Sequence, residues 1–314
     1  MSWDLGRHSD YTLEAGQMLG NGQYGMVLAA IHRSSKEPAA VKVVSASDPA
    51  SSQMARSEAA ILKTIHHDGV VSVCRLVETS SNLYLVMERM DTDLLTMLFS
   101  APGQMLEEEM SKFMIYQILT AVRFLHDRDI AHCDLKPENV LLRSLGTHRV
   151  LPIQAKLCDF GFSRCIPKGN SCDDCVGTRA YMAPEVRLRC GFDRALDMWS
   201  VGVVCYGLLT GTFPFNNGSE EMLLASQVDD VQFMFPPVIW GAFGLEAAEF
   251  VWALLRWHPN ERLNAAEALC HRWMRTRELR ADLRRLEKAL GRRWLTDPLE
   301  DQSWEVGIEE VSTA

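Results

Sequence analysis

The stretch that decides the fold is HCDLKPENVLL at residues 132–142, followed by the twelve-residue interval RSLGTHRVLPIQ and by AKLCDFG at residues 155–161. It supplies Asp134, Asn139 and Asp159 as oxygen donors. Phosphoryl transfer from a metal–nucleotide complex needs a carboxylate that orients the attacking hydroxyl and accepts its proton, and further oxygen ligands that hold magnesium ions against the phosphates. We predict the first role for Asp134 and the second for Asp159 and Asn139.

This order of residues resembles the catalytic loop and magnesium motif of the eukaryotic protein kinases. A DFG tripeptide alone recurs by chance, whereas many such pieces in the correct order and spacing are a strong signal. Within the calcium/calmodulin-dependent superfamily the chain most resembles the protein kinase D catalytic domain, over residues 12 to about 305. The supporting segments are EAAILKTIHHDGVV, HCDLKPENVLL, KLCDFGFSR, LDMWSVGVV, GTFPFN and DLRRLEKALGRRW.

The resemblance implies an α+β, bilobal protein-kinase fold over residues 12–273, with a small β-rich N-lobe (about 12–88) and a larger, mainly helical C-lobe (about 91–273). Outside it we expect an N-terminal extension (1–11), a basic amphipathic helix (274–295) and an acidic tail (296–314). Protein kinase D members carry lipid- and diacylglycerol-binding domains ahead of the kinase, and this sequence shows none. The chain is thus a stand-alone catalytic protein or a fragment.

The composition, with 314 residues of which 47% are hydrophobic and 23% charged, is that of an ordinary globular protein. A net charge of −9 argues against a nucleic-acid-binding protein and suits basic substrates. The longest apolar stretch, Val201–Leu209, is too short for a transmembrane segment, so we expect a cytoplasmic protein that can also be nuclear. The nine scattered cysteines indicate reduced core thiols.

Residues 12–44 alternate like strands around the glycine-rich turn GNGQYGMV at residues 20–27. Glycines let backbone N–H groups approach nucleotide phosphates without obstruction by side chains. The same pattern can open a Rossmann helix, but the strand-like continuation MVLAAIHR indicates a hairpin. By resemblance, the nucleotide-binding residues are Leu19, Gly20, Asn21, Gly22, Gln23, Tyr24, Gly25, Val27, Ala40, Lys42, Met87, Glu88, Met90, Asp93 and Leu141.

Lys42 is the one charged residue in the apolar segment AAVKVV. An isolated lysine at a strand end commonly extends to the surface. In a kinase, this position contacts the α- and β-phosphates and a glutamate on the next helix. Glu58 is the candidate partner, because it lies in MARSEAAILKTIHH, where apolar residues recur at helical spacing.

The segment Asn82–Met90 predicts a buried strand that leads into an interlobe hinge. The resemblance implies that Met87 is the gatekeeper behind the adenine, and that the backbones of Glu88 and Met90 hydrogen-bond the adenine edge. Met87 is equally well explained as a core methionine, and the two interpretations are compatible. Asp93 is a helix N-cap by default, whereas in the family an acid here contacts the ribose or a basic substrate residue.

Residues 159–185 resemble an activation segment closed by Ala-Pro-Glu. The resemblance implies that Thr178 hydrogen-bonds toward Asp134 and Lys136, a trait of Ser/Thr kinases. Because a free histidine titrates near neutrality, His132 is a candidate for acid–base work, but the family uses the histidine at this position for packing under the magnesium motif.

Two residues further along the chain are expected to support the large lobe. Asp197 begins an apolar helix, as an N-cap by default, and the resemblance implies that it braces the backbone of the catalytic loop. Arg262 is the predicted partner of Glu185 in a buried bidentate ion pair.

The activation segment departs from the family pattern. Cys133 stands where many kinases place a phosphate-binding arginine, although protein kinase D shares this cysteine. The two serines phosphorylated in that family fall on Asn170 and Asp174, with Ser171 out of register. Cys172 and Cys175 form a CxxC, but no second pair accompanies them, so we predict no redox or zinc site there.

We hypothesise that this chain does not require activation-loop phosphorylation. Asp173 and Asp174 together approach the charge of a phosphoserine, without its geometry. Arg164 is the best candidate for their cationic partner, and Arg56 is the second. The alternative is that both aspartates are solvated loop acids.

The stretch RTRELRADLRRLEKALGRRW after Trp273 places leucines on one helical face and arginines over the rest. Such basic amphipathic helices can bind calmodulin or membrane surfaces. The commoner arrangement is docking on the parent domain, and the resemblance of this stretch to the family favours it.

These features predict an ATP- and Mg²⁺-dependent serine/threonine protein kinase acting on protein substrates. The predicted catalytic residues are Lys42, Glu58, Asp134, Lys136, Asn139, Asp159 and Thr178. Because Asp93 and Glu138 should flank the substrate groove, we expect a basic residue three positions before the acceptor. The alternative is a pseudokinase that binds without turnover; it is disfavoured because Lys42, Asp134, Asn139 and Asp159 are all present.

Overall fold

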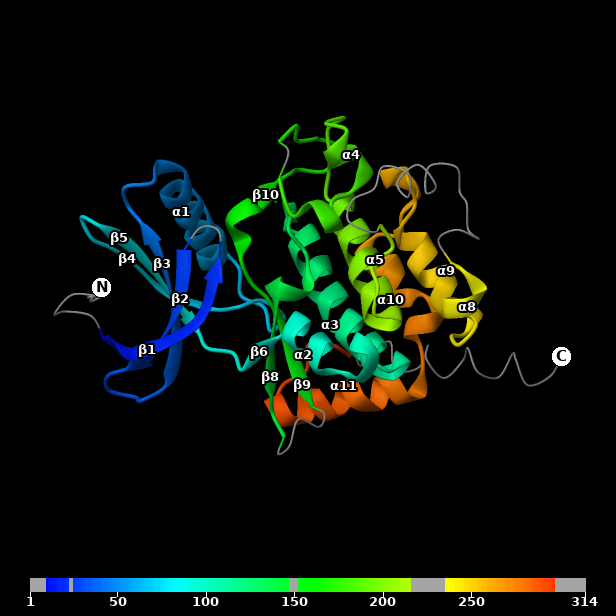
Figure 1. Ribbon diagram of the computed structural model, residues 1–314, viewed down its shortest axis with the longest axis horizontal. Helices are drawn as coiled ribbons and strands as arrows, with labels where there is room; N and C mark the ends of the chain where they lie inside the picture. The colour runs from blue at the N-terminus through cyan, green and yellow to red at the C-terminus, as the bar shows by residue number, and fades with distance from the viewer. Residues whose placement is uncertain (1–9, 23–24, 147–151, 175, 216–234, 297–314) are drawn as a thin grey trace.

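The computed structural model describes residues 10–22, 25–146, 152–174, 176–215 and 235–296. A five-stranded sheet with one helix forms the first lobe, and helices dominate the larger second lobe (Figure 1). The predicted α+β, two-lobed architecture is therefore confirmed. Within these ranges, no helix is both long and apolar enough to cross a membrane. Most of the predicted extension and acidic tail lies outside the described residues.

The N-lobe sheet has the order β1-β2-β3-β5-β4, with antiparallel neighbours. Its strands are β1 (Tyr11–Gly22), β2 (Gly25–His32), β3 (Pro38–Ser45), β4 (Val73–Glu78) and β5 (Asn82–Glu88). Because β1 pairs with β2 as far as Gly22 and Gly25, the glycine-rich turn is a hairpin and no Rossmann helix follows it. Gly25 has a φ of +150°, and a Cβ there would lie 2.3 Å from the carbonyl oxygen of Val43, so only glycine fits.

Helix α1 (Pro49–Thr64) contacts β3 and β5 and brings Glu58 to its buried face. The helix begins well before the apolar stripe that predicted it. Its first turn is instead specified by Asp48, whose carboxylate accepts a hydrogen bond from the amide of Ala50, and by Pro49 at the first helical position.

The C-lobe is organised around two buried helices, α3 (Glu108–His126) and α5 (Ala195–Thr210), which pack against each other. The surrounding helices are α2 (Leu94–Ser100), α4 (Pro184–Arg187), α8 (Pro237–Trp240), α9 (Leu245–Leu254), α10 (Ala265–Cys270) and α11 (Arg277–Leu290). Two small sheets pair β6 (Thr92–Asp93) with β8 (Val140–Ser144) and β9 (Ile153–Leu157), and β7 (Ile130–Ala131) with β10 (Arg164–Cys165). These short strands hold both ends of the catalytic loop.

Helix α11 packs along the C-lobe against α3 (Figure 1). Its leucines at 279, 283 and 286 are fully buried, so the amphipathic face is docked on the parent domain. The helix is shorter than the predicted 274–295. Its N-terminus is fixed by the side chain of Thr276, which accepts a hydrogen bond from the amide of Leu279, and its C-terminus by Gly291 with a φ of +70°.

Candidate active site

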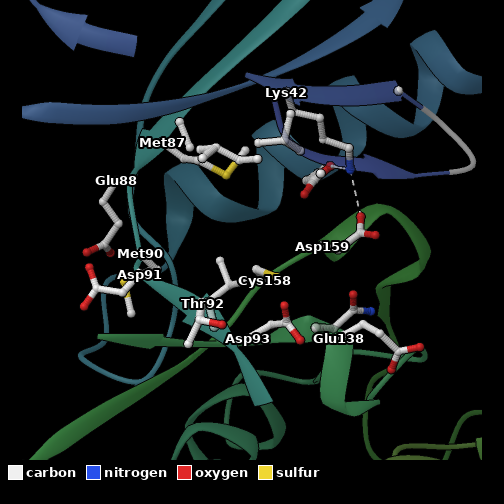
Figure 2. A pocket seen from close by; sticks show the side chains of 18 residues that line it. Lys42, Met87, Glu88, Met90, Asp91, Thr92, Asp93, Glu138, Cys158 and Asp159 are labelled. Atoms are coloured by element: carbon white, nitrogen blue, oxygen red, sulfur yellow. Dashed lines mark hydrogen bonds and ion pairs between the residues drawn. The ribbon is translucent and has the colours of Figure 1, made fainter. Parts of the chain in front are cut away.

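A cavity of about 360 Å³ lies between the two lobes, where β3, the hinge and the catalytic loop meet (Figure 2). Most of the predicted nucleotide-binding residues line it, namely Leu19, Gly20, Gly25, Val27, Ala40, Lys42, Met87, Glu88, Met90, Asp93 and Leu141. Asn21 and Gly22 form the end of β1, paired with Met26 and Gly25. Gln23 and Tyr24 lie outside the described residues.

Three further residues line this cavity that the sequence did not single out: Asp91, Thr92 and Cys158. Asp91 and Thr92 are polar residues directly between the hinge and Asp93, and that position alone was a usable signal. Cys158 immediately precedes Asp159, but an apolar residue at the end of a strand predicts core packing. Burial raises the pKa of the Cys158 thiol well above its usual range, so the side chain stays neutral.

Lys42 lies between two carboxylates. Its Nζ is 2.7 Å from Glu58 Oε2 and 2.8 Å from Asp159 Oδ1 (Figure 2). Glu58 also accepts a hydrogen bond from the backbone amide of Phe160, whose ring is completely buried. The predicted contact between Lys42 and Glu58 is confirmed, and through it α1 is tied to the segment that carries Asp159.

Burial and pairing act in opposite directions on these charges. Burial favours the neutral amine of Lys42, but the carboxylates of Glu58 and Asp159 outweigh it and raise its pKa. Burial likewise disfavours the charge of Asp159, and Lys42 nevertheless lowers its pKa. The side chain of Glu58 is almost completely buried, and this burial raises the pKa of its carboxyl group. The ammonium group of Lys42 therefore favours the ionised form of Asp159 and opposes the effect of burial on Glu58.

Asp134 is held on both of its carboxylate oxygens. Oδ1 accepts from the amide of Thr178 at 2.8 Å and from its hydroxyl at 2.7 Å. Oδ2 lies 2.9 Å from Lys136 Nζ and 3.1 Å from Asn139 Nδ2. Lys136 also donates to the Thr178 hydroxyl at 2.7 Å, so the contacts predicted for Thr178 are confirmed. The carboxylate is fixed in one orientation before any substrate binds.

The backbone that carries Asp134 is strained and braced from below. Cys133 has a φ of +67°, in the left-handed region. The buried carboxylate of Asp197 accepts from the amides of His132 at 2.8 Å and Cys133 at 2.9 Å, and lies 2.9 Å from His126 Nε2. Burial opposes ionisation, but these hydrogen bonds lower the pKa of Asp197. Asp197 therefore braces the loop, and Arg194 occupies the cap position that the default interpretation gave to Asp197.

His132 is fully buried and has both ring nitrogens in contact with the backbone. Its Nε2 lies 3.0 Å from the carbonyl oxygen of Cys158, and its Nδ1 accepts from the amide of Asp134 at 3.3 Å. The ring packs against Phe160 with 4.8 Å between centroids. This geometry is that of a packing residue.

Asn139 and Asp159 fit the donor set of a magnesium ion. Asn139 donates through Nδ2 to the backbone carbonyl of Asp134 at 2.8 Å, which turns its oxygen away from that contact. Asp159 contacts Lys42 through one carboxylate oxygen, which leaves the other oxygen available as a metal ligand. Both residues line the cavity, and oxygen atoms of amides and carboxylates are the ligands that Mg²⁺ takes in proteins. Among the described residues, no cluster of three or more His, Cys, Asp or Glu side chains forms a protein-only metal cage.

The activation segment makes two contacts that bear on the predicted loop pairing. Arg164 Nε lies 2.9 Å from Asp174 Oδ2, as predicted for the better of the two candidate cations. Cys172 and Phe192 exchange backbone hydrogen bonds of 2.8 and 2.9 Å. The second candidate was wrong: Arg56 pairs with Glu78 on β4 at 3.1 Å. Cys175, the other half of the CxxC, lies outside the described residues.

Arg262 and Glu185 form the predicted buried ion pair. Both guanidinium nitrogens Nη1 and Nη2 lie 2.7 Å from the two carboxylate oxygens, and the arginine side chain has no exposed surface. Arg262 also donates to three backbone carbonyls, so the pair connects α4 to the segment before α10.

The fold has two lobes, and the cavity between them is bounded by a glycine hairpin, a buried lysine–glutamate pair and a braced carboxylate. This combination defines the class of protein kinases. Residues 13–274 match the family model for the protein kinase domain, and the chain belongs to that family. More particularly, it is similar to the serine/threonine kinases of the D group. It is 40% identical to serine/threonine-protein kinase D3 of Mus musculus over 300 residues, which are 95% of this chain and 33% of the relative.

Two other relatives show the same relation. Serine/threonine-protein kinase dkf-2 of Caenorhabditis briggsae is 41% identical over 296 residues, 94% of this chain and 24% of the relative. Serine/threonine-protein kinase D2 of Homo sapiens is 40% identical over 297 residues, 94% of this chain and 33% of the relative. The chain thus spans about a quarter to a third of the length of these relatives.

Proposed function

We propose that this protein is an ATP-dependent serine/threonine protein kinase that transfers the γ-phosphoryl group to protein hydroxyls. The observation that carries the proposal is the fixed carboxylate of Asp134, which is held by Thr178 and Lys136 and contacts Asn139. Asn139 lines the cavity that contains the Lys42, Glu58 and Asp159 cluster. A pseudokinase, which binds without turnover, needs neither a fixed orientation of the Asp134 carboxylate nor the complete set of catalytic residues.

The residues divide the work by position. Lys42 neutralises charge on the bound nucleotide phosphates, and Glu58 keeps the Lys42 ammonium group in place. Gly20, Gly25 and Val27 cover the nucleotide, while Met87 and the hinge close the back of the cavity. Asn139 and Asp159 would hold Mg²⁺, which when bound neutralises phosphate charge and aligns the phosphates.

Asp134 orients the substrate hydroxyl and accepts its proton as the new oxygen–phosphorus bond forms. Lys136, 2.9 Å from Asp134, is placed to compensate negative charge on the transferred group. Because the site supplies positioning and fixed charge, its rate enhancement depends on these side chains staying in their present orientation.

The test is transfer of labelled phosphate from ATP to a peptide library by the natural protein, by Asp134→Asn and by Asp159→Asn. Each variant preserves shape and removes one negative charge, so we expect a loss of about 10²-fold or more from both. Equal signals from all three proteins would reject the proposal. Nucleotide binding measured by calorimetry on the same samples separates a binding protein from an enzyme.

We further propose a preference for a basic residue, Arg above all, three positions before the acceptor. Glu138 supports it, because it lines the cavity, is exposed, and forms no ion pair within the described chain. Asp93 contributes less than its position suggests: both of its oxygens are engaged by Thr96, as the N-cap of α2. The test compares Glu138→Gln with Asp93→Asn, which keeps the cap. We expect the first to weaken the preference more, and unchanged selectivity in both would remove this pocket.

We also propose that activity does not require phosphorylation of the activation segment. The contact between Arg164 and Asp174 and the backbone pair between Cys172 and Phe192 support an ordered segment without a phosphate. A phosphoserine would supply about 1.5 to 2 negative charges, and Asp173 with Asp174 approaches that value.

A further inference from the structure

Two arginines without acidic partners lie beside the residue that contacts Asp134. Arg179 directly follows Thr178 and is exposed, and Arg187, the last residue of α4, is half-buried. Arg187 Nη2 donates to the carbonyl oxygen of Arg179, which brings the two residues together. Neither forms an ion pair with any acid in the described ranges, whereas Arg164 and Arg194 do.

Arg187 is incompletely satisfied where it stands. Its Nε is buried and has no hydrogen-bond partner among the described residues. Burial, together with the nearby positive charge of Arg179, lowers the pKa of Arg187. A buried donor without a partner costs about 1 to 3 kcal/mol, and two adjacent cations repel each other. An anion at this place would relieve both.

The orientation of Asp134 indicates which residues of a bound substrate lie beside Arg179. Its Oδ2 faces Lys136 and Asn139, which flank the Pro137–Glu138 pair, and its Oδ1 faces Thr178, the residue before Arg179. A peptide with its hydroxyl at Asp134 and its preceding residues toward Glu138 therefore leaves along Arg179. An extended chain advances about 3.3 to 3.6 Å per residue, so the contact falls within the first three positions after the acceptor.

We propose that Arg179, with Arg187 behind it, forms a subsite for an aspartate or glutamate of the substrate one to three positions after the acceptor. The proposal rests on the kinase function proposed for this site. Guanidinium groups bind carboxylates through paired, charge-assisted hydrogen bonds. Together with Glu138 at the other end, the subsite gives the groove opposite charges on its two sides, so that the preferred substrate is basic before the acceptor and acidic after it.

The experiment uses serine peptides with arginine three positions before the acceptor and either Asp or Asn at one of the next three positions. The natural enzyme should favour the Asp peptide at one position by about three- to tenfold in kcat/KM, the range for a partly exposed charged contact. Arg179→Gln should bring this ratio close to one. The matched control is Arg189→Gln, which removes an exposed arginine just after α4 and should leave the ratio unchanged.

Charge reversal keeps the test decisive if a neutral variant folds poorly. Arg179→Glu should invert the preference, so that a Lys peptide becomes better than the Asp peptide. Raising the salt concentration should reduce the natural ratio, since screening weakens exposed charge pairs. Equal kcat/KM for the Asp and Asn peptides at all three positions overturns the subsite and leaves the kinase function standing. Absence of phosphate transfer to every peptide overturns the kinase function itself.

Discussion

The charged residues that line the cavity and those of the activation segment differ in how far they are buried and in how they are paired. Lys42 and Glu58 expose 13% and 2% of their side chains, and each has its partner within 3 Å. Arg164 and Asp174 expose 32% and 55%, and Arg179 has no acid partner in the described chain. Buried pairs cannot exchange partners with water, so they fix geometry; exposed charges can, and so they suit recognition and regulation. If this contrast is correct, the effect of removing a charge should fall with its exposure.

The largest effect should come from Arg262→Ala. The variant leaves the buried carboxylate of Glu185 without its partner, which typically costs about 3 to 5 kcal/mol of unfolding free energy. Denaturant unfolding followed by circular dichroism measures it. The matched control is Arg56→Ala, which breaks a pair with 46% and 48% exposed side chains and should cost less than about 1 kcal/mol. Equal losses in the two variants would contradict the contrast.

Lys42→Met should come next, with its effect on turnover. The nucleotide phosphates lose their fixed cation and Glu58 loses its partner, so we expect kcat/KM to fall by about 10²- to 10³-fold. Steady-state kinetics on a basic peptide measures the loss, with exposed Lys36→Met as the control. A variant that kept more than a tenth of the natural rate would show that this buried cluster is only structural.

A smaller effect is expected from His67, which is partly buried. Its ring stacks on Phe124 at 4.4 Å, meets Trp294 at 5.2 Å and accepts a hydrogen bond from the amide of Gly69. Burial, with Arg128 and Arg123 nearby, lowers the pKa of His67 from 6.5 to about 4.

The sign of the pH dependence follows from the lowered pKa. The unfolded chain takes up the proton first, so the stabilisation is complete above pH 6.5 and is lost as the pH falls toward about 4. We expect a loss of about 1 to 2 kcal/mol over this window, after allowing for the partial exposure of the ring. His67→Gln should lack this component, whereas exposed His66→Gln should retain it. Identical melting curves against pH for all three proteins would disprove the assignment.

The smallest effect should come from the exposed acids of the activation segment. Asp173→Asn with Asp174→Asn removes the partner of Arg164, and an exposed pair contributes about 0 to 1 kcal/mol, so activity should fall only several-fold. Protein made in bacteria and treated with phosphatase should remain active. Loss of all activity on that treatment would point instead to phosphorylation of Ser171 or Thr178.

Much of the site was predictable because its residues have fixed neighbours along the chain. The catalytic loop places Asp134, Lys136 and Asn139 within six residues, and the family resemblance was enough to anticipate the contacts of Thr178 and the pair between Glu185 and Arg262. The two-lobed fold was implied by the family resemblance, whereas the alternation of residues 12–44 indicated only the strands around the glycine-rich turn.

The contacts that the sequence did not predict are those in which the tertiary fold decides which partner a charged side chain meets. Arg56 pairs with Glu78, 22 residues away on β4, and not with the loop aspartates. Glu287, in the arginine-rich helix, was not singled out from the sequence. In the structure its carboxylate accepts hydrogen bonds from the amides of Trp294, Leu295 and Thr296, and so folds the chain back after α11. Neither outcome follows from local periodicity.

The position of Lys42 between two carboxylates also governs its chemical reactivity. An amine attacks an acylating reagent only through its unprotonated form, and the raised pKa of Lys42 keeps that form rare at neutral pH. Lys36 and Lys63 are exposed to solvent. General amine reagents should therefore modify those surface lysines first, and Lys42 should react only with an electrophile that is delivered into the cavity and displaces its acidic neighbours.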